Sequence, residues 1–304
     1  MRRRSVFFAL LLYGCAPPAA MMAGDAGAPA AADAGAVTIG PSGPLSFAVF
    51  GDTRPPNLND TAGYPSAIVA GDFALMAQKG ARFAVGTGDY MFANADQAVQ
   101  AQVALFQTAE GSFPAPIYLA MGNHECTGAT ASNCPSFAET FNVRGFMSRL
   151  LPPAVALPYY RVDVDTPHGK AKFVFIAANA WSSAQAEWLT AQMADPTTYT
   201  FVVRHEAPSV KQTPGVAPSE AIVNTRPFTL ELLGHSHRYQ RLDADHVISG
   251  NGGAPMDGLS GGTHYGFLLI SQLDDGNLSV TEIDEASGNA LDAWRVTPDG
   301  FDAP

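Results

Sequence analysis

Basic residues are scarce in this sequence. The 304 residues include 17 lysines and arginines against 28 aspartates and glutamates, which gives a formal net charge of −11. A protein that holds nucleic acid depends on basic side chains that neutralise phosphates. The charge balance therefore argues against a nuclease or another nucleic-acid-binding protein.

Long hydrophobic runs are also few. The apolar run Val6–Tyr13 is too short to cross a bilayer as a helix. It follows three arginines and precedes a small residue and a cysteine, an order typical of a signal peptide. Because Leu12–Cys15 is similar to the lipobox of bacterial lipoproteins, we expect residues 1–15 to be a signal peptide with Cys15 as the lipidated residue. The chain would then be exported and lipid-anchored to a bacterial membrane, on its periplasmic or cell-surface side. The alternative is an ordinary secretory signal.

Residues 16–43 consist mainly of alanine, glycine and proline, with scattered aspartate. Such a segment cannot bury enough apolar surface to offset its loss of conformational entropy, so it is predicted to be a disordered linker. Residues 44–304 contain no second low-complexity break and no repeat, which favours one large domain. From Cys15 onward, 14 basic residues face 28 acidic ones, a net charge of −14.

Only three cysteines are present. Besides Cys15, these are Cys126 and Cys134, close together in a chain that we expect to be exported, where disulfides persist. We therefore predict a disulfide between them. Two free thiols or a soft-metal site are the alternatives, and the spacing does not support the latter.

The first half of the domain predicts a βαβαβ unit with parallel strands. Short β-prone runs occur at 45–50, 82–85 and 116–121, and helical spacing occurs between them at 64–78 and 95–110. The second half predicts a helix at 183–193. Its predicted strands lie at 159–164, 172–177, 200–203, 228–233, 246–249, 267–272, 278–283 and 293–296. The last four look antiparallel and suggest a second sheet packed on the first, within an α/β fold.

Polar side chains follow five of these strands, where open α/β sheets place their ligands. A glycine before such a residue lets the backbone turn sharply and approach an ion. Singly, each motif has an ordinary explanation: a helix N-cap for Asp52 or Asp89, a turn for Asn123, a core histidine for His205. Those explanations would have to hold at all five loops together. The loops are Gly51-Asp52-Thr53-Arg54, Gly88-Asp89, Gly122-Asn123-His124-Glu125, Arg204-His205 and Gly234-His235-Ser236-His237.

The ordered set GD, GD, GNHE, H and GHSH resembles the calcineurin-like metallophosphoesterase superfamily, nearest to its purple acid phosphatase-like branch. The similarity extends over residues 46–237. It implies a four-layer α/β/β/α sandwich, with two mixed β-sheets flanked by helices. It also implies a hydrolase that cleaves phosphate mono- or diesters by attack of a hydroxide bridging two divalent ions. Mn, Zn or Fe suits this donor set, and the acidic surface does not exclude a small phosphate-ester substrate, since the ions supply positive charge.

The resemblance also assigns roles to individual residues. Asp89 would bridge both ions. Asn123, His205 and His235 would complete one ion, and Asp52 and His237 the other. His124 would stabilise the transition state or protonate the leaving oxygen. We expect His168 and His246 to lie outside the site, and His264 is left open.

Two positions depart from the family pattern. Arg54 stands where a metal-binding histidine is usual, and a guanidinium has no lone pair to give. Phe92 stands where purple acid phosphatases have a tyrosine ligand, and Tyr90 is two residues out of register. The second ion would thus be weakly held, completed by water, or present only with substrate. We predict that Arg54 instead binds substrate phosphate; an outward-facing arginine is the alternative. A catalytically weak or inactive lipoprotein that acts as a binding module remains the other reading of the chain.

Overall fold

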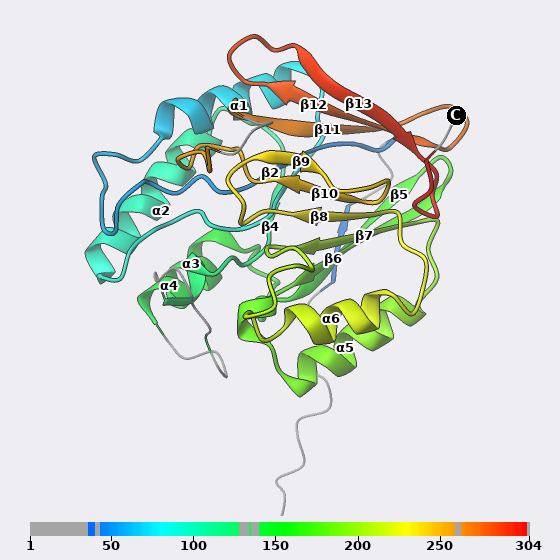
Figure 1. The fold of residues 1–304 in the computed structure, drawn as a ribbon, viewed down its shortest axis with the longest axis horizontal. Coiled ribbons are helices and arrows are strands. Elements are labelled where there is room, and N and C mark those ends of the chain that lie inside the picture. The colour runs from blue at the N-terminus through cyan, green and yellow to red at the C-terminus, as the bar shows by residue number, and fades with distance from the viewer. Residues whose placement is uncertain (1–35, 40–42, 128–133, 135–139, 259–262, 303–304) are drawn as a thin grey trace, which may run out of the picture. The chain divides into compact units, whose positions relative to one another are not determined.

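The computed structural model describes residues 36–39, 43–127, 134, 140–258 and 263–302. Two β-sheets form its centre (Figure 1). The predicted signal peptide and Cys15 lie outside the described residues. In spatial order, the first sheet contains β13 (Ala290–Val296), β12 (Leu278–Asp284), β11 (Gly266–Gln272), β2 (Ser46–Phe50), β3 (Ala84–Gly86) and β4 (Ile117–Leu119). The second contains β1 (Ala36–Ile39), β5 (Tyr160–Thr166), β6 (Gly169–Ile176), β7 (Tyr199–Arg204), β8 (Leu230–Leu233), β10 (His246–Ser249) and β9 (Tyr239–Arg241).

The predicted βαβαβ unit is confirmed. Strands β2, β3 and β4 pair in parallel and are connected by α1 (Ser66–Gln78) and α2 (Asp96–Glu110). The prediction that the last strands build a second sheet is wrong. Strand β11 pairs antiparallel with β2, and β12 and β13 follow it, so these strands extend the first sheet past the edge that β2 would otherwise expose. Only β10 joins the other sheet, in parallel with β8.

The second sheet is mixed. Strands β5 and β6 form an antiparallel pair, and β6, β7, β8 and β10 run in parallel. The linker prediction fails at its end, because Ala36–Ile39 form strand β1 alongside β5. The sequence Val37-Thr38-Ile39 is β-branched, and Val37 packs against the core, which offsets the cost of ordering this short segment.

Helices cover the outer face of each sheet, which confirms the four-layer sandwich (Figure 1). Helices α1 and α2 pack together over the first sheet, and α5 (Ser183–Ala194) and α6 (Val216–Val223) over the second. Aromatic rings join the two sheets: the Phe47 ring of β2 lies edge-on to Phe173 at 4.9 Å and to Phe201 at 5.0 Å. This rigid interior holds the ends of both sheets in fixed positions.

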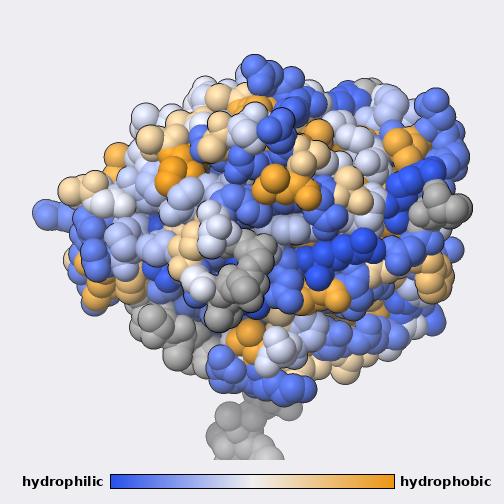
Figure 2. All heavy atoms as spheres, turned by 45° about the horizontal axis from the view of Figure 1, so that its top comes forward, coloured by the Kyte–Doolittle hydropathy of each residue, from blue (hydrophilic) through white to orange (hydrophobic). Residues whose placement is uncertain are grey.

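The shorter helices carry no periodic signal long enough to predict. They are α3 (His124–Thr127), α4 (Phe141–Gly145) and a π-helical turn over Phe146–Leu150. Among the described residues, none of the helices is long and apolar enough to cross a membrane. On the face seen in Figure 2, hydrophobic residues are scattered between polar ones.

Candidate metal centre

The six predicted metal ligands come together where strands of both sheets end. Asp52, Asp89 and Asn123 follow the neighbouring strands β2, β3 and β4 of the first sheet. His205 and His235 follow the neighbouring strands β7 and β8 of the second sheet. The centre therefore lies where the carboxyl ends of two packed sheets meet, and His237 completes it from the loop after β8.

Three of these residues have a left-handed backbone. The φ angles are 57° at Asp52, 62° at Asp89 and 70° at His235, and among the described non-glycine residues only Asn59 shares this conformation. Such a conformation costs free energy for a residue with a Cβ and is concentrated at functional sites. Here it turns each side chain inward directly after a strand.

Glycines next to these residues provide space as well as turns. A Cβ on Gly122 would lie 2.3 Å from the Asp89 Oδ1 atom, and one on Gly88 would lie 2.5 Å from the His205 Nδ1 atom. Neither distance is compatible with a side chain. The glycines of the motifs are thus required for the close approach of Asp89 and His205.

The ligands predicted for one ion converge within hydrogen-bonding distance. The Asn123 Oδ1 atom lies 3.1 Å from His205 Nε2 and 3.1 Å from His235 Nδ1. The Asp89 Oδ1 atom lies 3.3 Å from His205 Nε2. The other nitrogen of His205, Nδ1, donates to the Thr87 carbonyl at 2.9 Å. That bond directs Nε2 toward the two oxygens, the arrangement that orients histidine ligands in metal sites.

The ligands predicted for the other ion also lie together. Asp52, Asp89 and His237 each offer a ligand atom within 4.8 Å of the others, and all three residues are buried. The His237 Nδ1 atom donates to the Pro255 carbonyl at 2.7 Å, which directs Nε2 toward Asp52 Oδ1, 3.6 Å away. That oxygen makes no hydrogen bond to any described residue, as expected of an atom that faces a cation.

The pKa values of Asp52 and Asp89 are shifted in opposite directions. Burial raises the pKa of Asp52 well above its ordinary value. Burial would do the same at Asp89, but the charges of His205, His124 and Arg54 hold its pKa well below the ordinary value. Asp89 is therefore ionised, the state in which a carboxylate can bind a metal ion.

The pKa values of the histidines are also shifted in opposite directions. Burial, reinforced by His205, lowers the pKa of His235 to about 4, and burial and Arg54 lower the pKa of His237. Both rings are neutral near pH 7, so each has one ring nitrogen with a lone pair. Burial opposes a proton on His205, but Asp89 raises its pKa well above the ordinary value. A proton and a divalent ion would compete for this lone pair.

Glu125 organises the backbone of the centre, a role that we did not predict. Its buried carboxylate accepts three backbone N–H groups, from Asp89, Tyr90 and Gly122, each at 2.8 Å. These bonds tie the loop after β3 to the loop after β4. The signal was present in Gly122-Asn123-His124-Glu125, where an acidic residue ends a motif whose other polar members are ligands.

Arg54, Phe92 and His124 lie side by side at the centre. The Arg54 guanidinium lies 4.8 Å from the centre of the Phe92 ring, and that ring lies edge-on to His124 at 4.5 Å. The His124 Nε2 atom is 3.7 Å from the Asp89 Oδ2 atom. Arg54 thus faces the centre rather than solvent, and Phe92 fills the space between the arginine and the imidazole.

The remaining predicted residues lie elsewhere. Tyr90 is buried with its hydroxyl accepting from the Gly88 N–H at 3.0 Å, so it does not replace the missing tyrosine. His264 bonds to Glu282 at 2.9 Å, which answers the question left open by the sequence. His168 is exposed in the turn between β5 and β6, as predicted.

The predicted disulfide between Cys126 and Cys134 is present, with the two Cα atoms 5.3 Å apart. Both cysteines are buried. Because Cys126 belongs to the same short helix as His124, the bond anchors the chain directly after the Asn123-His124 pair.

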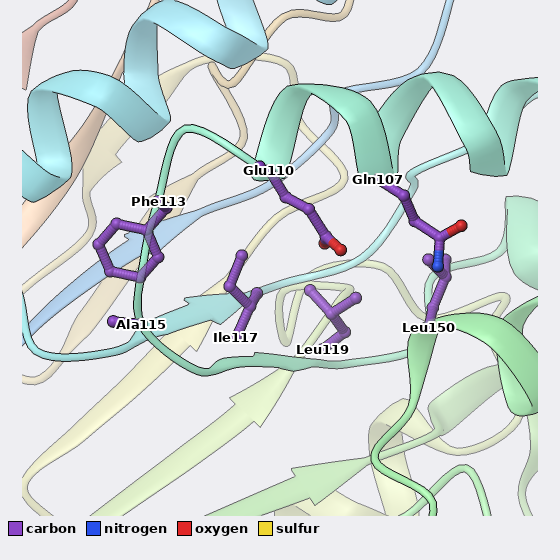
Figure 3. Close-up of a pocket in the computed structure, with 8 residues that line it drawn as sticks. Gln107, Glu110, Phe113, Ala115, Ile117, Leu119 and Leu150 are labelled. Atoms are coloured by element: carbon purple, nitrogen blue, oxygen red, sulfur yellow. The ribbon is translucent and has the colours of Figure 1, made fainter.

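A separate hollow of about 280 Å³ lies between α2 and β4 (Figure 3). The Glu110 carboxyl group points into it beside Ile117 and Leu119, and burial raises the pKa of Glu110 to about 7. None of the predicted ligands lines this hollow. The hollow is therefore separate from the strand-end centre.

No protein-family model matches the sequence, and no curated protein matches it. Solved structures do match it. The purple acid phosphatase from yellow lupin (Lupinus luteus) seeds aligns with a TM-score of 0.62 and 15% identity, over 84% of this chain and 54% of that chain. The protein has the fold of a purple acid phosphatase. The resemblance predicted from the five motifs is thereby confirmed for the fold.

Two further structures align over similar shares. The NAD nucleotidase of Haemophilus influenzae gives a TM-score of 0.46 at 13% identity, over 86% of this chain and 53% of that chain. The 5'-nucleotidase of Candida albicans gives 0.42 at 11% identity, over 83% and 52%. The chain thus spans about half the length of each of the three structures.

Proposed function

We propose that the protein is a metal-dependent phosphoesterase that hydrolyses phosphate mono- or diesters. The observation that carries this proposal is the convergence of Asp89, Asn123, His205 and His235 within 3.1 to 3.3 Å contacts. Carboxylate, amide and imidazole donors in one buried place suit Mn, Zn or Fe. The purple acid phosphatase fold supports the same reaction class.

These four residues fit a divalent ion. A bound ion would polarise a phosphoryl oxygen and make a water molecule nucleophilic near neutral pH. The chain supplies the geometry: Thr87 orients the His205 ring, and Glu125 holds the backbone of Asp89 in place. The buried setting strengthens each of these electrostatic interactions.

His124 is assigned the proton transfer to the leaving oxygen. Its Nε2 atom lies beside Asp89 Oδ2, and the Phe92 ring limits the movement of the imidazole. Its backbone N–H donates to Asp89 Oδ1 at 3.0 Å, which fixes its position relative to the ligand set. A positioned acid at this point would assist departure of an alkoxide.

Arg54 is assigned to the substrate phosphate. Its side chain is 12% exposed, and its Nε atom makes no hydrogen bond to any described residue. A guanidinium offers paired donors that match phosphate oxygens. The departure from the family pattern at this position would thus serve substrate binding.

The test is hydrolysis of a chromogenic phosphomonoester and a phosphodiester by metal-free protein to which Mn or Zn is returned. Activity that appears only with metal supports the proposal. Metal binding without turnover of either ester would favour the alternative, a lipoprotein that serves as a binding module. Export and lipidation at Cys15 are part of the proposal, and mass spectrometry of the processed N-terminus tests them.

A further inference from the structure

The Arg54 side chain lies among the ligands predicted for the second ion. The Arg54 Nη2 atom lies 3.3 Å from His237 Nε2, and the Arg54 Nε atom lies 3.8 Å from Asp89 Oδ2. Both partners belong to the ligand set predicted for that ion. The guanidinium thus places a positive charge of the protein among these ligands.

Contacts outside the ligand set hold the guanidinium there. Its Nη1 atom donates to the Pro55 carbonyl at 3.1 Å, and its plane is packed over the Phe92 ring. Two residues that depart from the family pattern therefore act together: Phe92 supports the arginine that stands in the place of a histidine. The guanidinium is thus held by three separate contacts, with His237, the Pro55 carbonyl and the Phe92 ring.

A second ion would compete with Arg54 for the same ligand atom and would be repelled by its charge. His237 has one lone pair at Nε2, because its Nδ1 atom donates to Pro255, and the Arg54 N–H group uses that lone pair. A divalent ion between Asp52 and Asp89 would also meet the arginine charge at close range, where like charges repel strongly. The Asp52, Asp89 and His237 set therefore does not fit an ion while Arg54 keeps its contacts.

We propose that the Arg54 guanidinium replaces the second cation, so that each chain binds one divalent ion, at Asp89, Asn123, His205 and His235. This rests on the proposed function only in taking that single ion as real. Asp52 then serves as an acceptor for the His235 backbone N–H, 3.0 Å away, rather than as a metal ligand. The inference differs from the two-ion centre that the family resemblance implies.

The experiment measures metal stoichiometry. Purified protein is dialysed against excess Mn²⁺, desalted and analysed by elemental mass spectrometry, and its electron paramagnetic resonance spectrum is recorded. Wild-type protein should hold one ion per chain with the signal of an isolated Mn²⁺. Arg54→His, which removes the guanidinium and adds an imidazole, should hold two ions with a spin-coupled signal. Arg54→Ala should bind a second ion more weakly.

Two controls locate the second ion. Arg241→Ala removes another arginine that lies over an aromatic ring, 4.7 Å from the centre of Trp294, and should leave one ion per chain. Asp52→Asn combined with Arg54→His should return the count from two to one. Circular dichroism confirms that each variant is folded.

The outcomes separate this inference from the proposed function. Two ions in wild-type protein, or one ion in a folded Arg54→His variant, overturn the inference and leave a metal-dependent phosphoesterase intact. No ion in folded wild-type protein overturns both. The wild-type count needs no variant, so the inference is tested even if every substitution at position 54 unfolds the protein.

Discussion

Among the described residues, the strand-end centre and a second cluster around His246 both have the composition of a metal site, but their histidines differ. In the strand-end centre, the Nδ1 atoms of His205 and His237 donate to backbone carbonyls. In the second cluster, around His246, both ring nitrogens face carboxylates: Nδ1 lies 2.9 Å from Asp243 and Asp245, and Nε2 lies 3.3 Å from Glu231. His205 Nε2 therefore keeps a lone pair for a metal, whereas both ring nitrogens of His246 face carboxylates.

The second cluster contains cations of the protein itself. Burial opposes a proton on His246, but Glu231 and Asp243 raise the pKa of His246 to about 10. Buried Arg204 pairs with Glu220 at 2.7 Å and with Glu231 at 2.8 Å. Proximity of suitable residue types alone therefore does not define a metal site. Whether such a cluster can bind a metal ion depends on the direction of each histidine lone pair. It also depends on whether a cationic side chain of the protein already pairs with each carboxylate.

The largest expected effect is the loss of activity when a ligand of the strand-end centre is removed. The matching variant removes an acidic residue of the second cluster. Asp89→Ala should lower phosphoesterase kcat/KM by at least about 10³, because several kcal/mol of charge stabilisation depend on the metal. Chelation of wild-type protein should do the same. Asp243→Ala should leave activity and metal content unchanged. Equal loss of metal in both variants would erase the distinction between the clusters.

His124→Ala tests the proton transfer next to the ligands. We expect kcat to fall by about 10² or more, as for loss of a positioned acid, with metal content retained. His168→Ala, in the exposed turn, is the matched control and should leave kcat unchanged. A wild-type kcat in His124→Ala would remove this residue from the mechanism.

Arg54→Ala tests phosphate binding with one equivalent of metal present. Loss of a charge-assisted contact of about 1.5 to 3 kcal/mol should lower kcat/KM about 10- to 150-fold. Arg241→Ala, which affects an arginine outside the centre, should change neither kcat nor KM. If Arg54→Ala retains wild-type kinetics under these conditions, Arg54 does not contact substrate.

The disulfide should affect stability more than chemistry. Replacing Cys126 and Cys134 by serine should lower the free energy of unfolding by less than about 3 kcal/mol, because the closed loop is short. Denaturant titration measures this change, and mass spectrometry without reductant establishes the bond in the exported protein. Two alkylatable thiols in that protein would contradict the assignment.

The smallest effect belongs to the second cluster. The folded-state pKa of His246 is raised from 6.5 to about 10, so its stabilising contribution is fully present below pH 6.5 and is lost as the pH rises toward 10. Because the ring is partly exposed, we expect this contribution to be about 1 kcal/mol. His246→Gln should show a shallower loss of stability between pH 6.5 and 9 in thermal unfolding. A wild-type pH profile in this variant would rule out the protonated pairing.

The sequence predicted the strand ends because four of the five short apolar runs stop at glycine and a polar residue, and the fifth stops at Arg204-His205. It did not predict which sheet the last strands join, since that depends on the edge of β2, which lies more than 200 residues earlier. Strand β1 was not predicted because its four residues lie within an Ala- and Gly-rich segment whose composition is typical of a disordered linker. The ligand types were readable in the motifs, but the contacts of Arg54 with His237 and Phe92 arise only when distant loops meet.

The left-handed backbone at Asp52, Asp89 and His235 affects how this centre can be dissected by mutagenesis. Alanine at any of these positions removes the ligand and also replaces a residue type that tolerates the left-handed conformation with one that tolerates it less well. At Asp52 and Asp89, asparagine tolerates that conformation better than alanine and retains an oxygen of similar reach. A comparison of Asp89→Asn with Asp89→Ala therefore separates the loss of ligand charge from the loss of backbone shape, whereas an alanine scan alone would combine the two.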